Sequence, residues 1–307
     1  MELYALRQKQ SLSLDAKIAL TERRIQEWAS YWNGDVYVAY SGGRDSTVLL
    51  DIARRVVPGI AAVFSDTGLE FPEIKEHVRN TENVTIIRPE RTFREVIETE
   101  GWPVASKKVA EFVRVVRENK PTTAISRRQY LEGINGAGKV DTRWQIPKKW
   151  LKLIDAPFKV SEKCCDIIKK KPLKRYVQET GRKGMIGTMA GDSFMRQRVY
   201  RKYGCNSYEG ACISRPLSTW LKKDILEYIE REGLAYSRIY DMGYRSTGCI
   251  FCAFGVQFDR EPNRFQMLQN THPALWKYCI ETLGLKEVLD YIGIPYKDET
   301  PLFGLMG

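Results

Sequence analysis

The sequence contains only two histidines, His77 and His272, among 307 residues. This scarcity nearly excludes a histidine-rich metal site and a serine–histidine–aspartate triad. No apolar run approaches the roughly 20 residues that span a bilayer, and the first ten residues are polar rather than signal-like. We therefore expect a cytoplasmic globular protein that makes no membrane contact.

Cysteine, in contrast, is well represented, with seven residues. In a reducing compartment, cysteines are more often buried thiols or metal ligands than disulfides. Because histidine is scarce, any metal site in this chain must rely on thiolates. The hydrophobic share of 43% supplies enough core-forming side chains for a folded chain.

The net charge of +11 is unevenly distributed along the chain. Residues 101–183 contain 21 basic and 8 acidic side chains, whereas the remaining residues contain 28 basic and 30 acidic ones. Aromatic residues are interleaved with the basic pairs. One interpretation is a set of solvated helix faces. The local concentration of charge favours instead a surface for a nucleic acid or another polyanionic acceptor, although it does not identify the polymer.

Short β-branched or aromatic runs alternate with segments of helical spacing. We predict strands over residues 35–40, 60–64, 84–87 and 184–187, and helices over 12–33, 72–80, 93–100 and 220–232. This alternation predicts an α/β fold, in which a parallel twisted sheet carries helices on both faces.

A glycine-rich turn, Ser41-Gly42-Gly43-Arg44-Asp45-Ser46, follows the first predicted strand. Glycines there let backbone N–H groups approach a phosphate, and the next helix adds the positive end of its dipole. Hydroxyls of Ser41, Ser46 and Thr47 and the charge of Arg44 could add to this anion site. Asp45 could hold the Mg²⁺ that accompanies ATP. The alternative is an ordinary strand-to-helix turn.

A second loop, residues 65–73, follows the second predicted strand. Open α/β sheets bind ligands beyond the carboxyl ends of their strands. Asp66, with Thr67 and Gly68 beside it, is therefore placed to meet the ribose, base or metal of a nucleotide. On residue type alone, a helix-capping turn is the simpler interpretation.

Four cysteines form two pairs about 85 positions apart, Cys164-Cys165 and the CxxC of Cys249 and Cys252. Four thiolates suit Zn²⁺ or an iron–sulfur cluster. Adjacent Cα atoms lie about 3.8 Å apart, which disfavours a bond within the tandem pair. Buried structural thiols and a redox CxxC remain alternatives. Cys205 and Cys212 are spare candidate ligands, and Cys205 is the first substitute if one of the tandem pair does not bind. Cys279 is expected in the core.

These motifs resemble those of a known superfamily. Residues 41–46 match the SGGxDS motif of the PP-loop ATP pyrophosphatases, with Arg44 where lysine is common, and residues 66–73, DTGLEFPE, are similar to a loop of the phosphoadenosine phosphosulfate (PAPS) reductase family. The resemblance implies an adenine nucleotide alpha hydrolase-like fold.

The cysteine motifs carry the same resemblance. Residues 164–173 resemble the CCxxRKxxPL motif, and residues 246–252 resemble the partner CxxC. It implies that Cys164, Cys165, Cys249 and Cys252 ligate a [4Fe–4S] cluster, with Zn²⁺ as the alternative. Ile168 replaces the usual arginine, with Lys170 nearby.

A substrate segment of the family is similar to residues 187–196, but Met189 stands where arginine is expected. Arg196 remains a candidate phosphate ligand, although the departure at Met189 weakens a direct transfer of the sulfonucleotide-binding role.

The resemblance suggests four segments. Residues 1–100 hold an N-terminal helix and the first part of the nucleotide-binding domain, and 101–183 form a basic, mostly helical insertion with the tandem cysteines. Residues 184–258 complete the PAPS-reductase-like domain with the CxxC, and 259–307 form a helical C-terminal segment.

Reductases of this family use a cysteine in a C-terminal tail, whereas no cysteine follows Cys279 here. We therefore expect an iron–sulfur ATP pyrophosphatase similar to those of DNA phosphorothioation. ATP·Mg²⁺ would adenylate an acceptor, and Arg44, Asp45 and Asp66 of this chain would act at the reacting phosphate. The acceptor would be a nucleic acid held by residues 101–183, and the sulfur would come from a cysteine desulfurase or a thiol donor. The alternatives are a PAPS or adenylyl-sulfate reductase that produces sulfite, and a non-catalytic nucleic-acid-binding iron–sulfur module.

Overall fold

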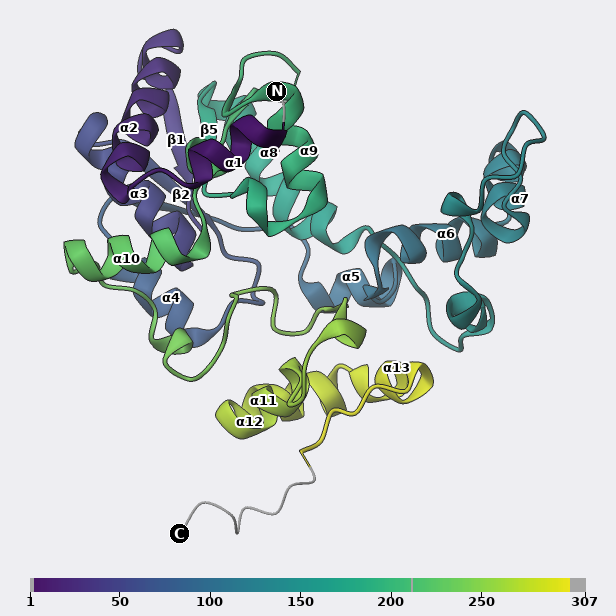
Figure 1. The fold of residues 1–307 in the computed structure, drawn as a ribbon. Helices are drawn as coiled ribbons and strands as arrows, with labels where there is room; N and C mark the ends of the chain where they lie inside the picture. The colour runs from purple at the N-terminus through teal and green to yellow at the C-terminus, as the bar shows by residue number, and fades with distance from the viewer. Residues whose placement is uncertain (1–2, 211, 299–307) are drawn as a thin grey trace. The chain divides into compact units, whose positions relative to one another are not determined.

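The computed structural model describes residues 3–210 and 212–298. The chain forms two compact units, residues 1–89 with 171–247, and residues 90–170 with 248–307 (Figure 1). The expected basic insertion is thus shared: residues 101–170 belong to the second unit and 171–183 to the first. Residues 299–307, which contain no cysteine, lie outside the described residues. Within them, no helix is long and apolar enough to cross a membrane.

The first unit contains a six-stranded sheet in the order β3-β2-β1-β5-β7-β6. Neighbouring strands run parallel except for the antiparallel β6–β7 pair. The strands are β1 (Val36–Ala39), β2 (Ala61–Ser65), β3 (Val84–Ile87), β5 (Lys183–Ile186), β6 (Asn206–Ser207) and β7 (Ile213–Ser214). The predicted mainly parallel α/β fold is confirmed.

Side chains of the strands point alternately to the two faces of the sheet, and helices pack on them. Tyr37, Val63 and Tyr176 form one buried cluster, which joins β1 and β2 to α8 (Lys171–Thr180). Because successive strand residues point to opposite faces, Val38 and Ala62 face the other side. The unit's other helices are α1 (Leu3–Gln10), α2 (Leu14–Tyr31), α3 (Arg44–Val56), α4 (Pro72–Arg79), α9 (Phe194–Tyr203) and α10 (Lys222–Glu232).

The four predicted strands and the helices over 72–80, 93–100 and 220–232 are confirmed within one or two residues. The predicted helix over 12–33 is also confirmed as α2, which begins after the N-cap Ser13. Strands β6 and β7 were missed because two residues are too few to show a period of two.

The second unit is mainly helical, as expected for the basic segment. Its small parallel pair joins β4 (Val104–Ala105) to β8 (Ala253–Phe254). Its α-helices are α5 (Phe93–Thr99), α6 (Lys107–Glu118), α7 (Ala124–Glu132), α11 (Arg264–Thr271), α12 (Pro273–Lys277) and α13 (Leu285–Ile292). Short 3-10 helices cover Thr142–Trp144 and Lys148–Asp155, and a π-helical turn covers Asp166–Lys170.

Candidate functional site

The loops predicted to form the site follow three adjacent strands. In β1, Tyr37 pairs in parallel with Ala61 of β2 on one side and with Gly184 of β5 on the other. The carboxyl ends of the three strands therefore lie at one edge of the sheet. The chain proceeds from β1 to β2 and β3, then continues on the other side of β1 with β5. Such a reversal of strand order is where open α/β sheets bind ligands.

Gly42 gives the loop between β1 and α3 its sharp turn. Its φ is +70°, and a Cβ atom would lie 2.9 Å from Cγ2 of Val78 and 3.0 Å from Cγ2 of Ile74. Only glycine suits this conformation and this space. Helix α3 begins two residues later and runs for 13 residues, so its first amides and the positive end of its dipole lie at the loop.

The hydroxyl groups predicted to bind phosphate hold the loop together. Ser46 Oγ donates to the carbonyl of Gly43 at 2.9 Å and accepts the amide of Ser41 at 3.2 Å. The hydroxyls of Ser41 and Ser46 lie 3.1 Å apart. Thr47 Oγ1 also donates to the carbonyl of Gly43, at 3.1 Å, and lies 3.3 Å from Nε2 of His77. These bonds preorganise the backbone, while phosphate binding by the three hydroxyls stays a prediction.

Arg44 lies against two tyrosines that sequence reasoning did not connect with the site. Its guanidinium carbon is 4.0 Å from the ring centroid of Tyr240 and 4.6 Å from that of Tyr236. Its backbone N–H donates to the hydroxyl of Tyr240 at 3.1 Å. Its Nε is buried and has no hydrogen-bond partner among the described residues. The two rings thus hold a cation at the start of α3.

Asp45 lies among charges from the loop that follows β5. Burial raises its pKa above the ordinary value, Asp192 raises it further, and Lys222, Arg196 and Arg44 oppose the rise. Arg196, a predicted phosphate ligand, forms an ion pair with Asp192. The structure therefore brings Asp45 and Arg196 into one group and adds Asp192. Two neighbouring carboxylates are a chemically suitable beginning of a Mg²⁺ site.

Asp66 is held by cations at the end of β2. Its carboxylate lies 2.8 Å from Lys75 Nζ and 3.4 Å from Arg88 Nε, and it accepts the amide of Gly68 at 3.2 Å. Burial alone would raise the pKa of Asp66, but Lys75, the Gly68 amide and Arg88 together lower it. Asp66 does not cap α4, whose N-cap is Phe71. The simple capping-turn interpretation is therefore wrong, and the carboxylate stays ionised at the sheet edge.

Thr67, predicted beside Asp66, closes the same loop. Its hydroxyl donates to Glu70 at 2.7 Å, and its backbone amide donates to the other carboxylate oxygen at 3.0 Å. Thr67 is buried, so it shapes the loop from within.

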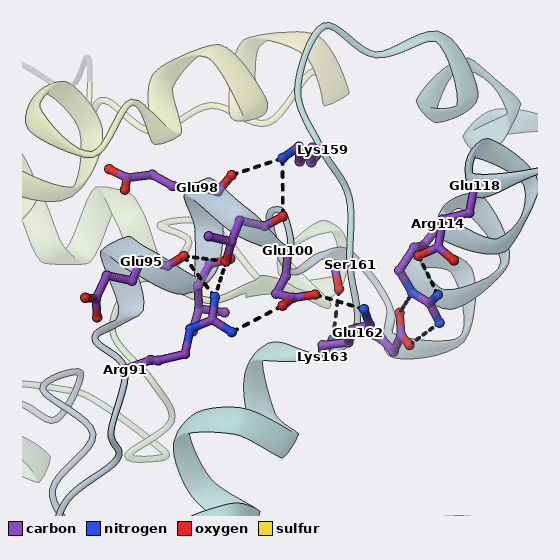
Figure 2. A network of polar contacts seen from close by, with 12 residues as sticks. Arg91, Glu95, Glu98, Glu100, Arg114, Glu118, Lys159, Ser161, Glu162 and Lys163 are labelled. Carbon is purple, nitrogen blue, oxygen red and sulfur yellow. Dashed lines mark hydrogen bonds and ion pairs between the residues drawn. The ribbon is translucent and has the colours of Figure 1, made fainter.

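In the second unit, ion pairs hold the segment that precedes the tandem cysteines (Figure 2). Lys163 Nζ lies 2.8 Å from Glu100. Arg114 binds both carboxylate oxygens of Glu162, at 2.7 and 2.9 Å. These ion pairs hold the two residues that come immediately before Cys164. The following π-helical turn is a rare element that occurs often at functional sites.

The four predicted ligand cysteines share one neighbourhood of the second unit. Burial raises the pKa of Cys164, and the charges of Cys165, Cys249 and Cys252 raise it further. Burial likewise raises the pKa of Cys252 to about 11, with contributions from Cys249 and Cys165. Yet no group of three or more Cys, His, Asp or Glu in the described ranges has a metal-binding arrangement. The donor chemistry fits a soft metal or cluster, while ligation stays a prediction.

Cations lie beside these thiols. The charge of Lys169 lowers the pKa of Cys164. Lys170 forms an ion pair with Asp166 at 2.5 Å. Near the CxxC, Arg264 donates to the carbonyl of Cys252 at 3.1 Å. Positive charge beside thiolates favours their ionised form.

The remaining cysteines are Cys205, Cys212 and Cys279. Cys205 belongs to the first unit, where burial raises its pKa and Arg24, Lys9 and Ser218 oppose the rise. Its role as the first substitute ligand stays a prediction. Cys279 is fully buried, as expected for a core residue.

Comparisons with known proteins show which family the chain is similar to. The sequence profile of the phosphoadenosine phosphosulfate reductase domain matches residues 35–143 and 139–254. Adenosine 5'-phosphosulfate reductase of Anoxybacillus flavithermus is 25% identical over 255 residues, which cover 82% of this chain and 86% of the relative.

Two uncharacterized proteins of Methanocaldococcus jannaschii are 21% and 26% identical, over 88% and 79% of this chain. The aligned residues cover 53% and 40% of these relatives, so the chain spans about half their length. The crystal structure of a phosphoadenylyl-sulfate reductase from Candida auris, a phosphate complex, is 18% identical, with a TM-score of 0.44, over 78% of this chain and 96% of the other.

Proposed function

The chain belongs to the phosphoadenosine phosphosulfate reductase domain family, and on this premise we propose that it binds an adenine nucleotide at the sheet edge and uses it in sulfur chemistry. One observation carries the proposal. The loop of residues 41–46 lies at the reversal of strand order and leads directly into α3. Backbone amides, Arg44 and Arg196 would neutralise the phosphates, and Asp45 with Asp192 would hold the accompanying Mg²⁺.

The first candidate activity is reduction of a sulfonucleotide. It is supported by the family and by relatives named adenosine 5'-phosphosulfate reductase. In this reaction one thiolate attacks the sulfur of the sulfonucleotide and releases the nucleotide. A second thiol then attacks the sulfur of the first thiol, forms a disulfide with it and releases sulfite. The products are sulfite, AMP (or its 3'-phosphate from PAPS) and a disulfide, so two thiols supply the two electrons. The sheet edge would orient the nucleotide's phosphate for release.

The four-cysteine neighbourhood would hold the cofactor. Cys164, Cys165, Cys249 and Cys252 would ligate a [4Fe–4S] cluster, with Zn²⁺ as the alternative. A cluster would supply a polarising, redox-capable charge. The protein's own contribution is to bury Cys164, to place Lys169 beside it, and to fix the preceding residues through the Glu100 and Arg114 ion pairs.

The second candidate activity is that of an ATP pyrophosphatase, and one observation favours it. Met189, at the position where the resemblance expects a substrate-binding arginine, is buried with 1% of its surface exposed. This position therefore offers no cation to a sulfate. An acceptor oxygen would attack the α-phosphate of ATP and release pyrophosphate. The terminal sulfur of a persulfide, supplied by a desulfurase or thiol donor, would then displace AMP, and a second thiol would cleave the remaining S–S bond, which leaves the thiolated acceptor and a disulfide. The acceptor would be a nucleic acid held by the basic segment.

The test separates these activities. The full chain is purified without oxygen, its iron, sulfide and zinc are measured, and it is incubated in turn with adenylyl sulfate, PAPS and ATP. Sulfite from a sulfonucleotide with a thiol donor supports the first candidate, and pyrophosphate from ATP with DNA or RNA supports the second. No product from any nucleotide would contradict both candidate activities and favour a non-catalytic binding module. Asp45→Ala should abolish turnover, whereas Asp35→Asn, an exposed carboxylate before β1, serves as the control.

A further inference from the structure

One surface of the second unit combines exposed aromatic rings with lysines, and we propose that it binds single-stranded nucleic acid. We define this aromatic-basic surface by Lys108, Trp144, Lys148, Lys149 and Phe258. The proposal rests on the acceptor in the second candidate function and deepens it by naming the substrate class, a single strand rather than a duplex.

Trp144 is the first ring of the surface, and 46% of it is exposed. Lys108 Nζ lies 4.6 Å from its ring centroid and donates to the carbonyl of Arg143 at 2.5 Å. Its centroid lies 6.1 Å from that of buried Phe112, which stacks on Tyr130 at 3.8 Å. The core and a lysine thus fix the indole, while nearly half of it remains open to a base.

Phe258 is the second ring, and 77% of it is exposed. Lys149 Nζ lies 5.7 Å from this ring and 5.1 Å from that of buried Trp150. The five residue-to-residue steps from Trp144 to Lys149 span at most about 18 Å. One short strand could therefore reach both cation–ring pairs.

The charge around these rings is available to phosphates. Residues 107–152 contain 12 basic and 4 acidic side chains. Three of the four acids are already paired: Glu118 with Arg114 and Lys120, Glu132 with Arg128, and Asp141 with Arg143. Lys148 and Lys149 are exposed, and neither forms an ion pair within the residues the structure covers.

Exposed rings beside unpaired lysines favour a single strand over a duplex. In a duplex, the faces of the bases are stacked on each other, so a protein ring cannot reach them. In a single strand, each base offers its face for stacking, and each phosphate attracts a lysine. The two kinds of side chain on this surface match these two features.

Fluorescence anisotropy tests the proposal with labelled oligo-dT and oligo-U of about 12 nucleotides, on the full chain and without any adenine nucleotide. We expect both strands to bind, and an unlabelled duplex of equal length to compete poorly. Trp144→Ala should weaken binding by about 5- to 150-fold, the equivalent of one base stack, without changing the salt dependence. Replacing Lys148 and Lys149 by alanine should reduce the slope of log affinity against log salt by about 0.7 for each phosphate that is no longer neutralised.

The first unit provides a matched control. Tyr203 is 48% exposed and carries Lys202 at 4.8 Å from its ring centroid, so Tyr203→Ala should leave binding unchanged. Phe258→Ala is a second test, because a ring exposed by 77% contributes little to folding. Wild-type affinity in both Trp144→Ala and Phe258→Ala, a loss in Tyr203→Ala instead, or equal binding of the duplex would overturn the proposal.

Turnover of adenylyl sulfate and PAPS is measured in parallel with no oligonucleotide present, and pyrophosphate release from ATP is measured with DNA or RNA added. Intact turnover with no strand binding would sink this inference alone. Strand binding that depends on Trp144, with no turnover of any nucleotide, would sink the proposed enzymatic function and leave this inference standing.

Discussion

The hydroxyl of Tyr240 lies 3.1 Å from the backbone nitrogen of Arg44 and accepts its hydrogen bond. Arg44 is the first residue of α3, so this amide is one that a bound phosphate could otherwise use. The ring of the same tyrosine lies 4.0 Å from the Arg44 guanidinium. Tyr240 therefore combines two opposite effects: its hydroxyl competes with an anion, while its ring holds a cation in place for that anion.

Two substitutions separate these effects. Tyr240→Phe keeps the ring and frees the amide, so we expect nucleotide and inorganic phosphate to bind up to about five-fold more tightly, the value of one neutral hydrogen bond. Tyr240→Leu removes the ring as well, so Arg44 loses its support and affinity should fall. Isothermal titration calorimetry with ATP and with phosphate measures both. Equal weakening by the two variants would contradict this account, because the hydroxyl would then assist binding directly.

The four-cysteine neighbourhood makes a second prediction. Single serine substitutions of Cys164, Cys165, Cys249 and Cys252 should each remove most of the iron and sulfide, or the zinc, from anaerobically purified protein. Cys212→Ser is the comparison for this spare candidate: its thiol donates to the carbonyl of Tyr208 at 3.2 Å, a bond that a serine hydroxyl can also make, so the variant should keep the metal, and a loss of metal there would make Cys212 a ligand. Metal content that is unchanged in all four variants would show that these thiols have a structural role.

Much of the fold could be predicted because its signals are local. The run from residue 36 to 39 is β-branched and aromatic, and the next residues contain two glycines before a helical spacing resumes. This order alone predicts strand, turn and helix. In contrast, β6 and β7 are defined by pairing between residues 206–207 and 213–214, which leaves no periodic pattern in two residues.

The candidate site was less accessible to sequence reasoning because several contacts are long-range. Tyr240 meets Arg44 across 196 positions of the chain, and its own neighbours contain no motif. Asp192 lies inside a segment already recognised from its resemblance, yet its effect on Asp45 depends on the pairing of β1 with β5. Lys169 and Lys170 are indistinguishable by residue type, and only the π-helical turn decides which one lies beside Cys164.

A third prediction concerns a buried ion pair in the first unit. Lys17 Nζ of α2 lies 2.6 Å from Asp224 Oδ2, with 0% and 4% of the two side chains exposed. Asp224 also accepts the amide of Leu221 at 2.6 Å, at the start of α10. Lys17→Met should lower the free energy of unfolding by about 3–5 kcal/mol, because it leaves a buried carboxylate unpaired.

Urea unfolding measures this loss, and an exposed pair provides the comparison. Lys286 and Asp290 are 2.8 Å apart with side chains exposed by 57% and 49%, so Lys286→Met should cost no more than about 0.5 kcal/mol. Similar losses in both variants would show that burial does not determine the value of the Lys17 pair.

The last prediction concerns the acid sensitivity of the second unit. Glu118 lies 2.9 Å from both Lys120 Nζ and Arg114 Nη1, and these hydrogen bonds lower its pKa to about 2 from an ordinary 4.5. A carboxyl whose pKa is lower in the folded state stabilises the fold above its unfolded pKa, and this contribution is lost as the pH falls toward the folded value. Glu118→Gln should therefore lower the free energy of unfolding at neutral pH, and its difference from wild type should shrink steadily between pH 4.5 and about pH 2.

Because 28% of the Glu118 side chain is exposed, solvent screening keeps the difference small, so chemical unfolding is followed at closely spaced pH values. Glu132→Gln, in the exposed pair with Arg128, is the control. A Glu118→Gln difference that stays constant down to pH 2 would mean that the glutamate acts through packing rather than through its charge.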